Sequence, residues 1–269
     1  MFLLLIFGAI ITENEYHKDS NLIASAVYHR LTVTDKADVK HIRLIADGCG
    51  GQNKNCIVLG ACCKWLLENS SIHTIELVFP VTGHSFMPAD RIFGVIERKL
   101  KTKEVILHPD EITKVLRESS SIVKFGNDCV VNDWRESVRK VLKQTTSWSV
   151  QFKDCKRFIL KRSKKVGNVL IRGELNYKSD LGKFENVCQK NKQISMLSPV
   201  PLPNIVPINK NKLQDVKKLL QKHFGLEWVA LESLTFYKEL FETQEELVAP
   251  QNEESFCNER IDETIELHV

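Results

Sequence analysis

The spacing of apolar residues over positions 1–101 alternates between two periods, and this alternation constrains the fold more than any other feature of the chain. Three short apolar runs are typical of strands buried on both faces. Each run is followed by a segment whose apolar residues recur at helical spacing. Strands that alternate with helices indicate an α/β layer with parallel pairing. We therefore predict the order strand-helix-strand-helix-strand-helix, with strands at 1–11, 41–47 and 72–81 and helices at 21–31, 56–69 and 88–101.

The first of these runs, residues 1–11, also resembles the apolar part of a signal peptide. It lacks a cationic leader and a small-residue cleavage site, and four polar residues follow it directly. We therefore favour a buried strand. No apolar run reaches the roughly 18 to 20 residues that a membrane-spanning helix needs, so we expect no membrane partner.

Eight cysteines raise the question of disulfides or zinc. No C-x-x-C pair occurs, and Cys62 and Cys63 are adjacent, which suits neither a shared metal nor a disulfide. Several of the cysteines fall around the predicted helix at 56–69, where a free thiol behaves as a small apolar side chain. These features predict free thiols in a reducing compartment, nuclear or cytoplasmic, for a protein that is not secreted.

Beyond residue 101 the pattern predicts a smaller α+β region and then a helical segment. We expect helices at 109–118 and 133–143, strands at 147–160 and 166–177, and helices at 212–224 and 231–241. Four of the eight prolines lie in one extended stretch. The predicted divisions are a core (1–120), a basic α+β extension (121–197), a proline-rich linker (198–208), a helical segment (209–241) and an acidic, disordered tail (242–269).

The formal net charge of +4 conceals a strong asymmetry. Residues 239–269 hold ten acidic side chains and one basic one, a net charge of −9, so the other 238 residues carry +13. A basic body with an acidic tail is typical of a protein that binds a polyanion. The alternative is that the tail is a plain solvated terminus.

Twelve of the basic residues lie within residues 153–192, against four acidic ones, with aromatic residues interleaved. This composition suits phosphate contacts with occasional base stacking, and it predicts DNA or RNA as the partner. The alternative is a solvated hairpin. The residues predicted to contact nucleic acid are Lys153, Lys156, Arg157, Lys161, Arg162, Lys164 and Lys165.

The loop at 47–55 joins a predicted strand to a predicted buried helix, and its sequence is DGCGGQNKN. Glycines in such a loop let backbone N–H groups approach a phosphate. The loop is neither a P-loop nor a dinucleotide fingerprint, because it lacks Gly-Lys-Ser/Thr and the third glycine. Asp47 places a carboxylate at the carboxyl edge of the sheet, where α/β proteins bind ligands. The alternative is that Asp47 forms an Asx turn that caps the loop.

A second motif, GHSFMPADRIFG, begins at residue 83 and opens the helix at 88–101. We expect Ile92, Phe93, Ile96 and Leu100 to form its core face. Asp90, Gly94 and Glu97 share a neighbouring face. Asp47 with Glu97 or Asp90 could hold Mg²⁺ or Mn²⁺, because such ions bind one or two carboxylates together with phosphates. A solvated acid pair is the alternative.

Together, these two motifs resemble an uncharacterised family of ribonuclease-H-like domains in transposon-derived proteins, common in arthropods. The segments TENEYHKDSNLIASAVYHRL and FYKELF are also similar to parts of that family. The order of elements resembles the core of DDE-type transposases and integrases. The resemblance covers residues 1–120 well and the rest loosely. It implies a ribonuclease-H-like fold and an ancestral metal-dependent DNA strand cleavage.

The resemblance implies that Asp47 is the second metal-binding acid and that Glu97 or Asp90 is the third. It also marks the other motif residues, Gly48, Gly50, Gly51, Gln52, Asn53 and His84. The family core starts with strands that carry a first acid, which residues 1–11 lack. We therefore expect a truncated core that does not cleave DNA and an exposed sheet edge that favours self-association.

The sequence leaves three functions open. The first is a transposase-derived protein that binds nucleic acid. The second is a nucleotide-binding α/β enzyme that uses the loop at 48–51, for which Glu76 is the only candidate ribose-binding acid. The third is a protein-interaction module without a ligand of its own.

Overall fold

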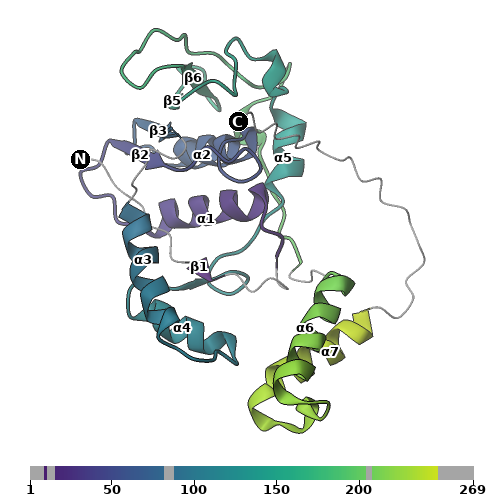
Figure 1. Cartoon of the computed structure of the whole chain (residues 1–269). Coiled ribbons are helices and arrows are strands. Elements are labelled where there is room, and N and C mark those ends of the chain that lie inside the picture. The colour runs from purple at the N-terminus through teal and green to yellow at the C-terminus, as the bar shows by residue number, and fades with distance from the viewer. Residues whose placement is uncertain (1–8, 11–15, 82–87, 204–207, 248–269) are drawn as a thin grey trace, which may run out of the picture. The chain divides into compact units, whose positions relative to one another are not determined.

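The computed structural model describes residues 9–10, 16–81, 88–203 and 208–247 (Figure 1). The chain divides into two compact units, Met1–Val206 and Pro207–Val269. Residues 121–197, expected to form an extension, lie in the first unit and supply half of its main sheet.

That sheet has four strands in the order β2-β3-β5-β6. β2 (His41–Ile45) and β3 (Thr74–Val78) are parallel, with Ile42 opposite Ile75, which confirms the predicted parallel pairing of these two segments. β5 (Arg157–Arg162) is antiparallel to β3, and β6 (Val169–Glu174) is antiparallel to β5. The structure is therefore of the α/β class with a mixed sheet.

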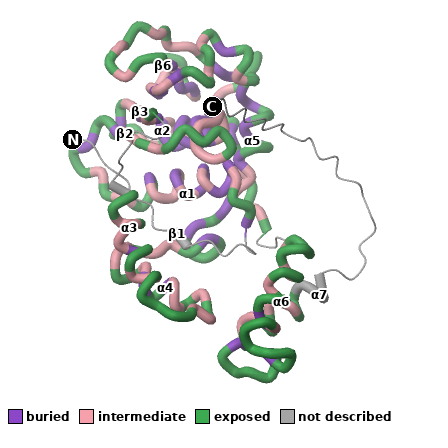
Figure 2. The backbone as a smooth tube through the Cα atoms, in the orientation of Figure 1, coloured by how far each residue is buried: buried purple, intermediate pink, exposed green. Residues whose placement is uncertain are grey.

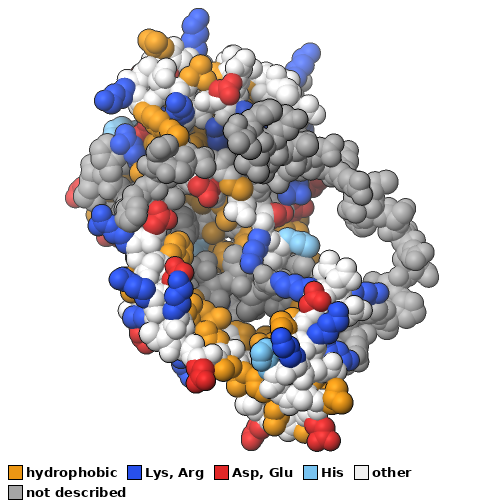
Figure 3. Space-filling view, viewed as in Figure 1, with side chains coloured by type: hydrophobic (Ala, Val, Ile, Leu, Met, Phe, Trp, Pro, Cys, Tyr) orange, Lys and Arg blue, Asp and Glu red, His pale blue; other side chains and the backbone are white. Residues whose placement is uncertain are grey.

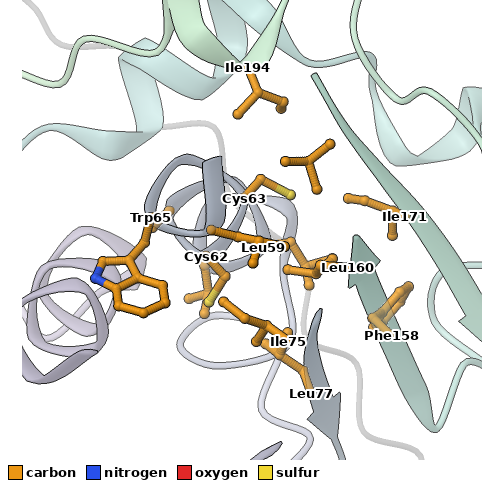
Figure 4. Close-up of a cluster of buried hydrophobic side chains, with 14 of the residues drawn as sticks. Leu59, Cys62, Cys63, Trp65, Ile75, Leu77, Phe158, Leu160, Ile171 and Ile194 are labelled. Atoms are coloured by element: carbon orange, nitrogen blue, oxygen red, sulfur yellow. The ribbon is translucent and has the colours of Figure 1, made fainter. Parts of the chain in front are cut away.

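One face of the sheet packs on α2 (Cys56–Glu68), and α1 (Ser20–Val33) packs on α2. Leu59, Cys62 and Cys63 of α2 meet side chains of β3, β5 and β6, whereas Trp65 extends toward α1 (Figure 4). The Trp65 indole donates to the Thr32 hydroxyl of α1 at 3.2 Å. Because α2 has neighbours on both sides, it is apolar almost all round, as predicted.

Side chains alternate along each strand, so the other face of the sheet carries polar side chains together with Ile45, Val78, Ile159 and Leu170. Three arginines and three carboxylates form a continuous chain of ion pairs across it: Arg43, Glu76, Arg157, Asp180, Arg172 and Glu174. The chain runs from β2 to β6, and Asp180 comes from the segment after β6. The Tyr177 hydroxyl, from the same segment, donates to the Phe79 carbonyl at 2.9 Å.

Smaller elements surround this core. β1 (Ala9–Ile10) pairs in parallel with β4 (Val123–Lys124), outside the four-stranded sheet. The rest of the predicted strand at 1–11 lies outside the described residues. α3 (Pro88–Lys101) contacts α4 (Pro109–Arg117), and α5 (Trp134–Val141) packs on α1 and α2. Two short 3-10 helices complete the unit, η1 (Thr145–Ser147) and η2 (Ile194–Met196).

Burial is concentrated in α1, α2 and the main sheet, whereas α3, α4 and α6 are mostly half-buried or exposed (Figure 2). On α3, Ile96 is buried as expected, but Phe93 is 55% exposed, so the predicted core face is only partly used. The strand expected at 147–160 begins only at residue 157, because Trp148 and Phe152 pack into the core from a turn.

The second unit consists of α6 (Lys210–Phe224), η3 (Trp228–Ala230), η4 (Glu232–Leu234) and α7 (Thr235–Leu247). Its buried side chains are Leu220, Trp228 and Leu234 among the described residues. Residues 242–247, assigned to the tail from the sequence, belong to α7, and residues 248–269 lie outside the described part. No described helix is long and apolar enough to span a membrane.

Candidate phosphate-binding loop

The loop at 47–55 connects the carboxyl end of β2 to the start of α2, as predicted. The backbone N–H groups of Gln52, Asn53 and Lys54 all donate to the Cys49 carbonyl, at 3.3, 2.8 and 2.9 Å. The Asn55 side chain accepts from Ile57 N and Val58 N at 3.0 Å each, which caps α2. The loop therefore has a defined shape without a ligand.

Further hydrogen bonds hold the glycine segment in place. The Asn55 amide donates to the carbonyls of Gly50 and Gln52, at 3.0 Å each. The Ser20 hydroxyl at the start of α1 donates to the Gly51 carbonyl at 2.9 Å. Ser20 was not predicted, because it lies 31 residues from Gly51 and no local pattern links the two.

The backbone N–H groups of three loop glycines differ from those of Gln52, Asn53 and Lys54. Among the residues that the structure describes, no acceptor receives a hydrogen bond from the backbone N–H of Gly48, Gly50 or Gly51. All three glycines are exposed, and a Cβ added to any of them would meet nothing within 4 Å. None has a φ in the left-handed region. Neither internal packing nor backbone conformation therefore explains why these positions are glycine.

Asp47 is exposed and serves its own loop. Its Oδ1 accepts from Cys49 N at 3.2 Å and from the Asn53 side chain at 2.5 Å. The first of these contacts is the Asx turn expected for Asp47, and it does not test a role in metal binding. Gln52 of the same loop is half-buried.

The predicted acids of α3 face solvent. Asp90 and Glu97 are both exposed. Glu97 pairs with Lys101 at 2.7 Å, and this hydrogen bond lowers the pKa of the Glu97 carboxyl. His84 lies outside the described residues.

A metal site would need several such groups close together. The described part of the chain contains no group of three or more His, Cys, Asp or Glu side chains that could hold a metal ion. Asp47 and Glu97 each have hydrogen-bond partners of their own. The roles predicted for Asp47, Asp90 and Glu97 in metal binding and catalysis remain predictions.

The basic residues predicted to bind nucleic acid are divided between two edges of the sheet. Because β5 is antiparallel to β3, Arg157 lies beside the carboxyl end of β3, and Lys161 lies beside its start. Lys153 and Lys156 precede β5, and the Lys54 ammonium, which is also close to the Phe79 ring, donates to the Lys153 carbonyl. Lys153 and Lys54 thus lie at the same edge as the loop.

The remaining predicted residues lie at the opposite edge. Arg162 donates to the carbonyls of Leu66 and Asn69, at 2.9 Å each, and of Ser70 at 3.0 Å, at the end of α2. The 13 residues of α2 span about 20 Å, so one phosphate cannot contact both edges. Lys164 and Lys165 are exposed in the β5–β6 turn, and Lys161 lies over the Phe184 ring at 3.7 Å.

Arg157 is engaged inside the protein. Its guanidinium donates to Glu76 Oε1 at 2.5 Å and to Asp180 Oδ1 at 2.8 Å, and the residue is 9% exposed. These bonds leave it unavailable to a phosphate unless they break. The partners Glu76 and Asp180 are 81 and 23 residues away, so the sequence could not reveal this role.

All seven described cysteines are free thiols. Burial raises the pKa of Cys62 to about 12, so this thiol stays protonated at neutral pH. Cys49 in the loop is exposed.

No curated protein and no solved structure matches the chain. A family model described as a domain of unknown function, DUF7869, matches residues 6–172. This match spans the loop, the main sheet up to β6 and helices α1 to α5. The chain therefore belongs to the DUF7869 family.

Proposed function

We propose that the protein binds nucleic acid and that the loop at 47–55 contacts the phosphate backbone. The observation that carries this proposal is the set of three exposed glycine N–H groups, at Gly48, Gly50 and Gly51, that have no acceptor among the described residues. Successive N–H groups of this kind, ahead of a helix N-terminus, favour an anionic oxygen.

Two further features support a polyanion over a simple anion. Lys54 and Lys153 lie at the same edge of the sheet as the loop. The 238 residues before the acidic terminus carry a net charge of +13. Phosphates in series along a nucleic acid could occupy the glycine loop and these lysines together. The resemblance to transposon-derived ribonuclease-H-like domains agrees with such a ligand.

A nucleotide-binding enzyme is the second candidate, because the same N–H groups suit a free nucleotide. The acid that the sequence suggests for its ribose, Glu76, has a side chain that is 13% exposed and is held by Arg43 and Arg157. This arrangement favours nucleic acid.

The decisive variant is Gly50→Ala. A methyl group there meets no protein atom and causes no backbone strain, so the variant should fold with a Tm equal to or above that of the parent. It would keep a phosphate away from the loop, and loss of a charge-assisted hydrogen bond should weaken binding by roughly tenfold. Fluorescence anisotropy with labelled duplex and single-stranded oligonucleotides measures this affinity.

Gly94→Ala is the matched control, because Gly94 also faces open space but lies on α3. It should leave the affinity unchanged. Equal affinities for the parent and Gly50→Ala would refute the proposed loop contact. If ATP displaces the oligonucleotide at a concentration at which inorganic phosphate does not, the nucleotide-binding enzyme would be favoured instead.

The proposal includes binding and no strand cleavage. We expect supercoiled plasmid to remain intact with Mg²⁺ or Mn²⁺, because the described acids are not assembled around a common point. Nicking by the parent that Asp47→Asn abolishes would contradict this expectation.

A further inference from the structure

Helix α6 of the second unit carries a continuous face of lysine and amide side chains. At 100° per residue, one side of the helix holds Asn211, Gln214, Lys217, Lys218, Gln221 and Lys222. All are exposed except Gln221, which is half-buried. Figure 3 shows lysine side chains gathered over α6.

Among the described residues of its own unit, few acidic side chains pair with this face. Lys218 lies 3.7 Å from Asp215, and both side chains are largely exposed, so this pair is weak. Lys217 and Lys222 form no ion pair with any described residue. The glutamates of this unit lie after α6, at Glu227 and beyond, so positive charge is concentrated on one helix.

The apolar side of α6 is partly covered by its own unit, although Leu219 is 55% exposed. Leu220 is 6% exposed, and α6 packs on η3, whose Trp228 is 3% exposed. A helix that binds a membrane surface needs its apolar side free to enter the lipid. This packing therefore disfavours an anionic membrane as the ligand of the basic face.

We propose that α6 lies in the major groove of double-stranded DNA, with its lysines on phosphates and its amides at base edges. An α-helix fits the major groove of B-DNA, and Asn and Gln pair there with adenine. The major groove of duplex RNA is too narrow for side chains to read, and the face has no aromatic ring on which single-stranded bases could stack. An acidic protein would pair with the lysines but would leave the three amides without a role.

This inference rests on the proposed function, in that it names the nucleic acid as duplex DNA. It uses a different unit from the glycine loop, so the two can fail separately. Loss of binding in Gly50→Ala alone supports the loop and refutes α6, and loss in the α6 variants alone supports α6 and refutes the loop.

The first test replaces the three lysines in the full-length chain, as Lys217→Gln, Lys218→Gln and Lys222→Gln together. Three lost phosphate contacts should make the slope of log K against log salt shallower by about 2 to 3. The control replaces Lys40, Lys114 and Lys124, exposed lysines of the first unit, by glutamine. It removes the same charge and should leave the slope nearly unchanged. An equal slope in parent and α6 variant would overturn the proposal.

The second test concerns sequence preference. We expect selection from a random duplex library to give a preferred site, and the pair Gln214→Ala and Gln221→Ala to reduce the preference over a scrambled site by about tenfold. A preference that survives in this variant would refute base reading by α6.

Two other outcomes would also overturn the proposal. In the first, the parent binds vesicles of anionic phospholipid, and the triple lysine variant loses this binding but still binds duplex DNA like the parent. The other is dissociation of a dimer, seen by sedimentation, as the only effect of the triple lysine variant. Circular dichroism and Tm equal to those of the parent are required of every α6 variant. The three lysines and Gln214 are exposed and Gln221 is half-buried, so the substituted chains should fold.

Discussion

The glycine loop at 47–55 follows one strand of the main sheet, and the β5–β6 hairpin, with the segment after it, forms the other half of that sheet. Both regions combine glycines with basic residues. They differ in whether these residues contact solvent or other parts of the protein. In the loop, the Cα atoms of three glycines meet open space. In the hairpin region, a Cβ on Gly173 would lie 2.7 Å from Cys155 Sγ, and one on Gly182 would lie 2.4 Å from the Gly173 carbonyl oxygen. A side chain would therefore be tolerated by the protein at the loop glycines, whereas at Gly173 and Gly182 it would collide with neighbouring atoms.

The basic residues differ in the same way. Arg157 and Arg172 of the hairpin are held by carboxylates on the polar face of the sheet, with side chains 11% and 16% exposed. Lys153 near the loop is exposed. A basic, glycine-containing segment can therefore be satisfied internally or available to a ligand, and only its three-dimensional partners decide which.

The largest effect should come from Arg157→Ala. It removes the centre of the ion-pair chain and leaves Glu76, whose side chain is 13% exposed, and the more exposed Asp180 with fewer partners. We expect the free energy of unfolding at pH 7 to fall by about 3 kcal/mol in urea titrations. Lys165→Ala, at an exposed position of the same hairpin, should change it by less than about 0.5 kcal/mol.

The pH dependence of this difference is set by Asp180. The hydrogen bond from Arg157 lowers the pKa of the Asp180 carboxyl below its ordinary value of 3.8. The contribution of this pair is therefore complete above pH 3.8 and is lost as the pH falls through the lower folded value. The difference in the free energy of unfolding between the parent and Arg157→Ala should therefore become smaller as the pH falls below 3.8. A difference that becomes larger would contradict the pairing of Arg157 with Asp180.

Gly173→Ala should rank second. The added methyl group would overlap Cys155 Sγ and lie 2.8 Å from Val150 Cγ2, so we expect a loss of about 1–3 kcal/mol in the free energy of unfolding. Thermal and urea unfolding both measure it. A neutral result would show that the hairpin glycines, like those of the loop, are not constrained by packing.

Asn55→Ala tests how the loop keeps its shape. The substitution removes the cap of α2 and the two bonds to Gly50 and Gln52, which should lower the free energy of unfolding by about 1–2 kcal/mol. Asn127→Ala, at an exposed position whose side chain forms no hydrogen bond with a described residue, serves as the control. Comparable losses in the two variants would argue against a pre-formed loop.

The smallest effect, and the only gain, is expected for Gly48→Ala. Alanine fits the folded conformation and restricts the unfolded chain, so the free energy of unfolding should rise by about 0.4–1 kcal/mol. A clear loss of stability would mean that a side chain at position 48 collides with a neighbouring group, as expected at Gly173, and the two regions would then not differ in this respect.

Much of the fold could be predicted, because it is encoded over short distances. The helical spacing around Leu59 and Trp65 gave α2 to within one residue of its end, and the apolar runs gave β2 and β3. The partners of Arg157, the antiparallel register of β5 and the bond from Ser20 to Gly51 join residues far apart, and no periodicity carries that information. The composition of the loop predicted a phosphate site, but which of its N–H groups lack a described acceptor depends on the folded backbone.

The antiparallel pairing of β3 with β5 has a consequence for synthesis of the chain. Val78 pairs with Arg157, so 79 residues must be added after β3 before its second neighbour exists. At about 5–20 residues per second, β3 waits roughly 4 to 16 s on the ribosome with that edge unpaired. An unpaired strand edge beside the apolar side chains of α2 is a site where a strand of another nascent chain can pair and start aggregation. Translation speed between residues 79 and 156 should therefore influence how much of this protein reaches the native state.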